Sequence, residues 1–279
     1  MEDVTAVAVQ TSTGLDVGKN IETTLAHLDR LAEGRTRPDL VCLPEMFTFR
    51  ALGARPTHEV AVRRESGLLD ELSARARTLG SYLVAGYLVT DENGRVHNET
   101  QVLNRDGKLV GLHRKSHLFD APGHDESAHV RPGDSLTVVR TDFGTFGIVV
   151  CYELRFPEIS RTLALAGAEI LVVPNSWPGD GTFCGEHDLS ILLAAAAVQN
   201  QAFVVHANQV GTVGDLDLAG GSCVLDPRGR VVKRAGCGPE IVTAWLDSGL
   251  LAETRSRRLV FNHRRPSLYD VAAVQSVSG

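Results

Sequence analysis

The sequence has no run of eighteen apolar residues and no basic leader followed by an apolar stretch. Nothing in it therefore predicts a membrane-spanning helix or a secretion signal. It also lacks an excess of basic charge, because 28 lysines and arginines stand against 34 aspartates and glutamates, for a formal net charge of -6. These absences predict a cytoplasmic protein whose partners are neither nucleic acids nor membranes.

Cysteine is scarce, and its spacing suits neither disulfide pairing nor zinc binding. The five cysteines are odd in number, widely separated, and include no Cys-x-x-Cys pair. This pattern predicts reduced thiols and excludes a disulfide framework or a zinc ribbon. The residues are Cys42, Cys151, Cys184, Cys223 and Cys237.

The chain lacks a low-complexity linker, so we expect residues 1–279 to form a single domain with a C-terminal tail from about residue 250. With 43% hydrophobic residues the chain can bury a large core. Short β-branched runs alternate with amphipathic helices expected near 17–33, 66–79, 157–166 and 186–200. The second half repeats the pattern of the first, which predicts an α/β fold.

Several apolar runs end in polar or reactive residues. The run 40–43 leads to Glu45, 109–112 leads to Lys115, 148–150 leads to Cys151, and 171–173 leads to Asn175 and Trp177. In open α/β sheets, ligands bind beyond the carboxyl ends of the strands. We therefore expect these side chains to converge although they are distant in sequence.

Glu45, Lys115 and Cys151 together fit one chemistry. A buried free cysteine is ordinarily an inert small hydrophobe, and this reading remains open for Cys151. A thiol that attacks a carbonyl needs a base, however, and Glu45 can serve as one. Lys115 and the backbone N–H that follows Cys151 can stabilise the oxyanion of a tetrahedral intermediate. The three residues therefore predict an acyl-transfer site.

At these residues the chain resembles the nitrilase superfamily of carbon–nitrogen hydrolases. The matching blocks are LVCLPEMF, HRKSHLFD and VVCYELRFPE, and the resemblance continues through GAEILVVPNSW, NQAFVV, GGSCVLDPRGRVV and HRRPSLYD. It covers nearly the whole chain. The resemblance implies a four-layer αββα sandwich with internal two-fold pseudosymmetry, which forms a homodimer or a larger homo-oligomer. It also implies hydrolysis with no cofactor and no metal.

The resemblance assigns a role to each residue of the site. It makes Glu45 the general base, Lys115 the oxyanion stabiliser and Cys151 the nucleophile. Glu126, in GHDESAHVRPGDS, falls where the family carries a second glutamate. We expect Glu126 to hold Lys115 and to orient the substrate without transferring a proton.

The residues after the cysteine bear on the substrate. Tyr152 and Glu153 stand where true nitrilases tend to carry Trp-Glu, and CYELRFPE looks more like the ω-amidase and Nit-type branches. These act on small carboxamides that bear a carboxylate; N-carbamoyl amino acid hydrolysis is the alternative. Arg155 is either a carboxylate partner or a structural ion-pair residue. The expected substrate-binding residues are Tyr152, Phe119, Asn175, Trp177 and Arg155.

One segment departs from the family pattern. The residues before NQAFVV usually read Arg-Ala-x-Glu-Asn, whereas Ala196 and Gln199 occupy the arginine and glutamate positions here. Joint loss of two opposite charges leaves no unpaired remnant, so it can be tolerated. The departure leaves the branch within the superfamily open.

Two readings from other classes remain. Histidines near the lysine block, with two neighbouring acids, offer the residue types of a metal site, although the surrounding sequence favours a strand and a loop over the helix that such spacing needs. A catalytically silent small-molecule-binding or assembly protein would keep the same sandwich. The metal alternative concerns His113, His117, His124, His129, Asp125 and Glu126.

Overall fold

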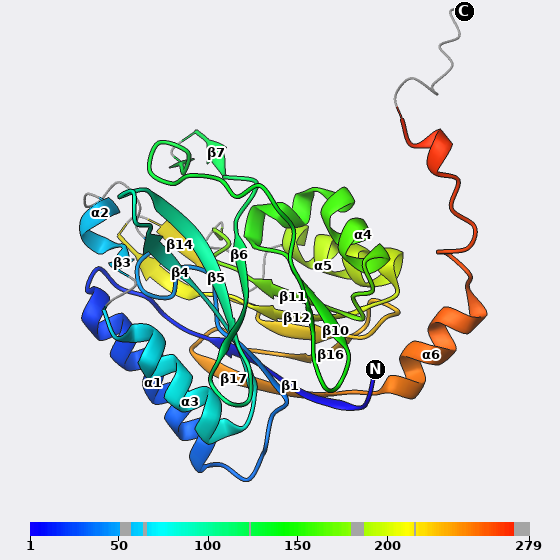
Figure 1. Ribbon diagram of the computed structural model, residues 1–279, viewed down its shortest axis with the longest axis horizontal. Coiled ribbons are helices and arrows are strands. Elements are labelled where there is room, and N and C mark those ends of the chain that lie inside the picture. The colour runs from blue at the N-terminus through cyan, green and yellow to red at the C-terminus, as the bar shows by residue number, and fades with distance from the viewer. Residues whose placement is uncertain (51–56, 64–65, 123, 180–186, 215, 271–279) are drawn as a thin grey trace, which may run out of the picture.

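The computed structural model describes residues 1–50, 57–63, 66–122, 124–179, 187–214 and 216–270 (Figure 1). One mixed sheet comes mainly from the first half of the chain, in the order β17-β1-β2-β4-β5-β6, with the short β3 paired to β4. Helices α1 (Val17–Glu33) and α3 (Leu68–Leu79) lie between its strands in sequence. The strands are β1 (Val4–Gln10), β2 (Leu40–Cys42), β3 (Val62–Arg63), β4 (Tyr82–Thr90), β5 (Val96–Leu103), β6 (Leu109–Arg114) and β17 (Glu240–Leu246).

A second mixed sheet comes from the later part of the chain, in the order β16-β15-β12-β11-β10-β9. Helix α4 (Pro157–Leu165) lies between β10 and β11, and helix α5 (His187–Asn200) lies between β11 and β12. The strands are β9 (Val138–Arg140), β10 (Thr145–Ile148), β11 (Ile170–Pro174), β12 (Phe203–Ala207), β15 (Cys223–Leu225) and β16 (Val231–Arg234).

The two sheets repeat one topology. Each has three parallel strands, β1, β2 and β4 in the first and β10, β11 and β12 in the second. One antiparallel strand flanks each trio on one side, β17 or β9. An antiparallel pair follows on the other side, β5 with β6 or β15 with β16. This repeat is the internal pseudosymmetry that the resemblance implied.

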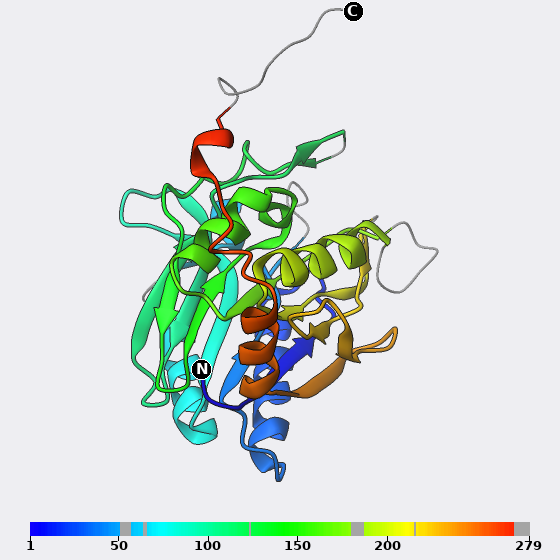
Figure 2. The same cartoon turned by 90° about the vertical axis from the view of Figure 1, so that its right-hand side faces the viewer.

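The side chains of β1 show how the layers pack. Val4, Ala6 and Ala8 enter the core between the two sheets, whereas Val7 and Val9 pack with α1 and α3. Both faces of the strand are buried, so its sequence is apolar at nearly every position. Helices α1 and α3 cover the outer face of the first sheet, and α4 and α5 cover that of the second (Figures 1 and 2). The fold is the predicted α/β sandwich of four layers, αββα.

The four long helices lie where the sequence predicted them, within two residues at each end. A turn of 3-10 helix between β10 and α4, the hairpin of β13 (Val210–Val213) and β14 (Leu216–Ala219), and the last α-helix were not predicted. No helix within the described ranges is long and apolar enough to cross a membrane. The remaining elements are α2 (Thr57–Val60), β7 (Asp120–Ala121), β8 (His124–Asp125), η1 (Cys151–Arg155), β13 (Val210–Val213), β14 (Leu216–Ala219), α6 (Ser248–Arg257) and η2 (Pro266–Leu268).

Candidate active site

Loops from both sheets meet beyond the carboxyl ends of their strands. Glu45 lies on the loop after β2, and Lys115 immediately follows β6. Cys151 lies on the turn after β10, and Asn175 directly follows β11. The backbone N–H of Glu45 donates to the carbonyl of Asn175 at 3.2 Å, which joins a loop of one sheet to a loop of the other.

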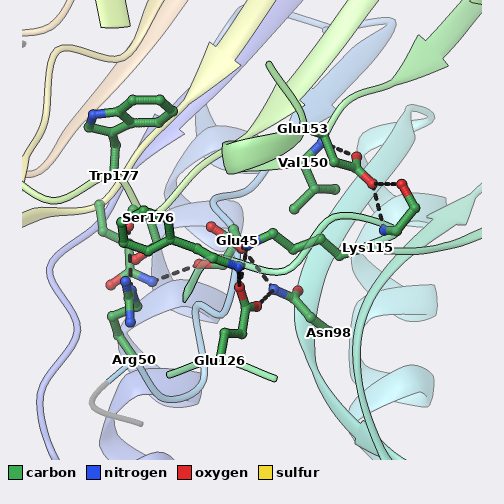
Figure 3. Close-up of polar contacts among 12 residues, drawn as sticks. Glu45, Arg50, Asn98, Lys115, Glu126, Val150, Glu153, Ser176 and Trp177 are labelled. Atoms are coloured by element: carbon green, nitrogen blue, oxygen red, sulfur yellow. Dashed lines mark hydrogen bonds and ion pairs between the residues drawn. The ribbon is translucent and has the colours of Figure 1, made fainter. Parts of the chain in front are cut away.

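Lys115 lies between two carboxylates. Its Nζ donates to Glu45 Oε1 at 2.9 Å and to Glu126 Oε2 at 2.8 Å (Figure 3). All three side chains are buried. Burial opposes the charged form of Lys115, but the charges of Glu45 and Glu126 outweigh it and hold the pKa of the ammonium above its ordinary value. Lys115 therefore carries a positive charge throughout the physiological pH range.

Asn98, the third residue of β5, fixes the two glutamates. Its Nδ2 donates to Glu45 Oε1 at 2.7 Å and to Glu126 Oε1 at 3.0 Å. Glu45 Oε1 thus accepts from both Asn98 and Lys115. Glu45 Oε2 is buried and has no hydrogen-bond partner among the described residues. A buried polar atom rarely lacks a partner without a functional reason, and Oε2 is the oxygen free to accept a proton.

Glu126 is more fully bonded than Glu45. Besides Lys115 and Asn98, it accepts a hydrogen bond from the backbone N–H of Phe119 at 2.8 Å. Burial opposes its ionisation, but Lys115 and the hydrogen-bond donors outweigh that effect and lower the pKa of Glu126. Both of its oxygens are occupied, which suits a residue that holds Lys115 in place.

Cys151 has a left-handed backbone, with φ of 49°, at the start of η1. That conformation is uncommon for a residue other than glycine and costs about 1–3 kcal/mol, so it is kept only where the surroundings enforce it. Burial and the charge of Glu45 raise the pKa of the Cys151 thiol, although Lys115 and a hydrogen bond from the Ser176 backbone act against them. The resting group is a neutral thiol, which would need a base to act as a nucleophile.

This direction of the pKa shift predicts a titration. Because the folded protein disfavours the thiolate, we expect Cys151 to show no ionisation below the ordinary thiol value of about 8.5. The ultraviolet absorbance of the thiolate, taken as the difference between the protein and its Cys151→Ala variant, measures it. A thiolate that forms with a midpoint near neutral pH would show that Cys151 is activated before substrate binds.

Glu153 connects the cysteine turn to the lysine loop. It accepts hydrogen bonds from the backbone N–H groups of Val150 and Ser116, both at 2.7 Å, and from the Ser116 hydroxyl at 2.6 Å (Figure 3). Burial opposes its charge, but His113 and the other donors lower the pKa of Glu153. His113 Nε2 lies 3.1 Å from Glu153 Oε2. The charged carboxylate therefore joins the residue before Cys151 to the residue after Lys115.

The residues expected to bind substrate fall into two places. The rings of Phe119 and Tyr152 contact each other with centroids 5.1 Å apart, beside the cysteine turn. Asn175 and Trp177 are buried on the loop after β11, and the Asn175 Oδ1 has no hydrogen-bond partner among the described residues. Arg155 is exposed, stacks over the Trp177 ring and lies 3.6 Å from Asp188.

The structure also bears on the metal-site alternative and on the prediction of reduced cysteines. Within the described ranges, no three side chains of histidine, cysteine, aspartate or glutamate are grouped so as to hold a metal ion. Cys42, Cys151 and Cys223 are free thiols. Cys237 is disulfide-bonded, so the prediction of five reduced cysteines is wrong for that residue. Cys184 lies outside the described residues.

Comparison with known proteins assigns the family. Residues 5–256 match the family model described as carbon-nitrogen hydrolase. The chain belongs to the carbon–nitrogen hydrolase family. It is therefore an enzyme of the nitrilase superfamily, as the sequence blocks indicated.

Three known proteins are similar to this carbon–nitrogen hydrolase over most of its length. Human deaminated glutathione amidase is 38% identical over 244 residues, covering 82% of this chain and 73% of the relative. Omega-amidase NIT2 of Xenopus tropicalis is 32% identical over 238 residues, covering 83% and 85%. The crystal structure of Saccharomyces cerevisiae Nit3, a member of branch 10 of the nitrilase superfamily, has a TM-score of 0.85 at 29% identity and covers 95% and 97%.

Sequence reasoning missed the supporting roles of Asn98 and Glu153. Asn98 lies in VHNETQVL, a strand whose eight residues are all buried although five of them are polar. Polar residues in succession usually indicate a solvated strand. The only signal for Asn98 was therefore this unusually polar run, which stands between two more apolar strands. His113, one of the residues weighed as a metal ligand, pairs with Glu153 instead.

Proposed function

We propose that this hydrolase is an amidase that converts a small linear carboxamide bearing a carboxylate into a carboxylic acid and ammonia, through a thioester on Cys151. One observation carries the proposal. Lys115 is held by two carboxylates beside the thiol, while Glu45 Oε2 accepts no hydrogen bond from any described residue. The names of two relatives, deaminated glutathione amidase and omega-amidase, support the substrate class.

In the first half-reaction, the Cys151 sulfur attacks the amide carbon while Glu45 Oε2 takes the thiol proton. The carbonyl electrons move to the oxygen, and Lys115 and the backbone N–H of Tyr152 stabilise the oxyanion. Collapse of the intermediate breaks the C–N bond, and Glu45 gives its proton to the departing nitrogen. Ammonia leaves, and the acyl group remains on sulfur.

In the second half-reaction, Glu45 takes a proton from water, whose oxygen attacks the thioester carbon. Lys115 stabilises the second oxyanion, the C–S bond breaks, and the proton held by Glu45 returns to the sulfur. Glu126 takes no proton in either half-reaction. It acts through Lys115, which it holds in place, and Asn98 in turn fixes Glu126.

The remaining pocket residues bind the substrate. We assign contacts with its carbon chain to the rings of Tyr152, Phe119 and Trp177. The buried Asn175 Oδ1, which lacks a partner among the described residues, suits the N–H groups of the substrate amide. Arg155 remains a candidate for the substrate carboxylate, but its contact with Asp188 favours a structural role.

A substrate screen tests the reaction class. Purified enzyme is incubated with succinamate, pentanamide, N-carbamoyl-β-alanine and pentanenitrile, and the released ammonia is measured. We expect kcat/KM for succinamate to exceed that for pentanenitrile by at least about a hundredfold. The reason is that Lys115 and the Tyr152 N–H suit the oxyanion of a carbonyl, and Glu45 can protonate an amine leaving group.

The other outcomes of the screen replace the proposal. A higher kcat/KM for the carbamoyl amino acid would make the enzyme an N-carbamoyl amino acid amidohydrolase. No turnover of any compound, with no acyl group on Cys151, would indicate a catalytically silent binding or assembly protein.

Assembly and location remain proposals. The outer helices expose Leu165, Ile191 and Val198, and this apolar surface supports a homodimer or a larger homo-oligomer through α4 and α5. In α5, Ala196 is buried and Gln199 is exposed. We propose that residues 1–279 act as one domain with a tail from about residue 250, because residues of both sheets share one core. A cytoplasmic location stays a prediction of the sequence.

A further inference from the structure

Arg50 is a buried cation that has no acidic partner in the described part of the chain. It lies on the same loop as Glu45, and its side chain is only 8% exposed. Its Nε contacts the Ser176 carbonyl at 3.4 Å (Figure 3). Among the described residues, no carboxylate lies within ion-pair distance of the guanidinium, and its two terminal nitrogens donate no hydrogen bond. Burying an unpaired charge costs free energy, so a functional reason for this position has to be sought.

The position of Arg50 places that charge at the reacting centre. Ser176, which its Nε contacts, hydrogen-bonds through its backbone to the Cys151 thiol. The charge of Arg50 also lowers the pKa of Cys151 and of His124, so the guanidinium is close to both. His124 in turn lies against Phe119, with ring centroids 5.2 Å apart. Arg50 therefore faces the space between the nucleophile and the proposed substrate-binding rings.

We propose that Arg50 binds the carboxylate of the substrate and selects ω-monoamides of short dicarboxylic acids. A guanidinium presents a planar fork of donors that matches a carboxylate, and an anionic substrate would supply the missing partner. Arg155 is less suited, because it is exposed and already contacts Asp188 and the Trp177 ring. The inference rests on the proposed amidase function and names the residue that sets its preference for an acidic substrate.

The experiment measures a ratio of rates. kcat/KM is determined for succinamate and for pentanamide, a neutral amide of similar length, in the wild type and in Arg50→Leu, Arg50→Lys and Arg155→Leu. We expect the ratio of succinamate to pentanamide to fall at least about thirtyfold in Arg50→Leu, mainly through a higher KM for succinamate. Arg50→Lys keeps the charge without the fork and should give a smaller fall. Arg155→Leu should change the ratio less than about threefold.

Each other outcome has a distinct meaning. If Arg50→Leu lowers kcat/KM equally for succinamate and pentanamide, Arg50 acts on Cys151 electrostatically and the inference is wrong. A fall in the ratio that follows Arg155 in place of Arg50 also overturns it. If Arg50→Leu fails to fold, Arg50→Lys decides. The inference then requires that Arg50→Lys lowers the ratio and loses competitive inhibition by succinate. A wild type without preference for succinamate would refute the proposed substrate class itself, whatever the Arg50 variants do.

Discussion

Cys151→Ala should lower kcat for amide hydrolysis by at least about ten-thousandfold while leaving the protein folded. The substitution removes the sulfur that forms the thioester, and no other described thiol lies on the loops around Lys115 and Glu45. Alanine fits the buried site without adding a polar group. Steady-state release of ammonia measures the rate, and thermal unfolding checks the fold.

Cys223→Ala is the matched control. Cys223 is also a free, buried thiol, and burial raises its pKa to about 11, but it lies on β15 with its sulfur 3.8 Å from His206 Nδ1. We expect this variant to keep most of the wild-type rate. Near wild-type turnover by Cys151→Ala would make Cys151 a packing residue and remove the nucleophile from the mechanism.

Glu45→Gln should lower kcat by at least about a hundredfold, within the usual contribution of general acid–base catalysis. Glutamine keeps the shape of the side chain, and its Oε1 can still accept from Lys115 and Asn98. It has lost the carboxylate oxygen that must take a proton in both half-reactions. The effect should therefore appear in kcat and persist with every amide tested.

Glu126→Gln separates proton transfer from electrostatics. It removes the same charge from the other side of Lys115, because Glu126 Oε2 and Glu45 Oε1 lie 2.8 Å and 2.9 Å from Nζ. We expect kcat to fall at least about tenfold less in Glu126→Gln than in Glu45→Gln. An unchanged kcat with a higher KM in Glu45→Gln would reduce Glu45 to a binding residue and leave Cys151 without its base.

The convergence of Glu45, Lys115 and Cys151 could be predicted from the sequence because these residues stand where strands end. Glu45, Lys115 and Cys151 each follow an apolar run. Strands β2 and β10 belong to the parallel trios, and β6, which is two antiparallel pairings from β4, runs in the same direction as β4, so the three ends lie on one side of the sandwich. The strand pattern alone is enough to predict that these side chains converge. The family blocks supplied the expected role of each residue and the position of Glu126, which lies on a loop that no periodicity predicts.

The supporting residues could not be predicted in the same way. Asn98 lies inside a strand, and its role depends on Glu45 and Glu126 reaching it from two other segments. Glu153 lies two residues after Cys151, but its bonds to Ser116 depend on the left-handed turn at Cys151. Arg50 is unusual only because it is buried. These properties arise from tertiary packing, which a single sequence does not display.

The central claim is that a thioester forms on Cys151 during turnover. Wild-type enzyme mixed with excess succinamate is quenched in acid after single-turnover times, digested, and analysed by peptide mass spectrometry. We predict a succinyl group on the peptide that contains Cys151, which disappears when substrate is exhausted and never forms in Cys151→Ala. Ammonia release by the wild type with no acyl group on that peptide at any quench time, or with the acyl group on another residue, would contradict the account.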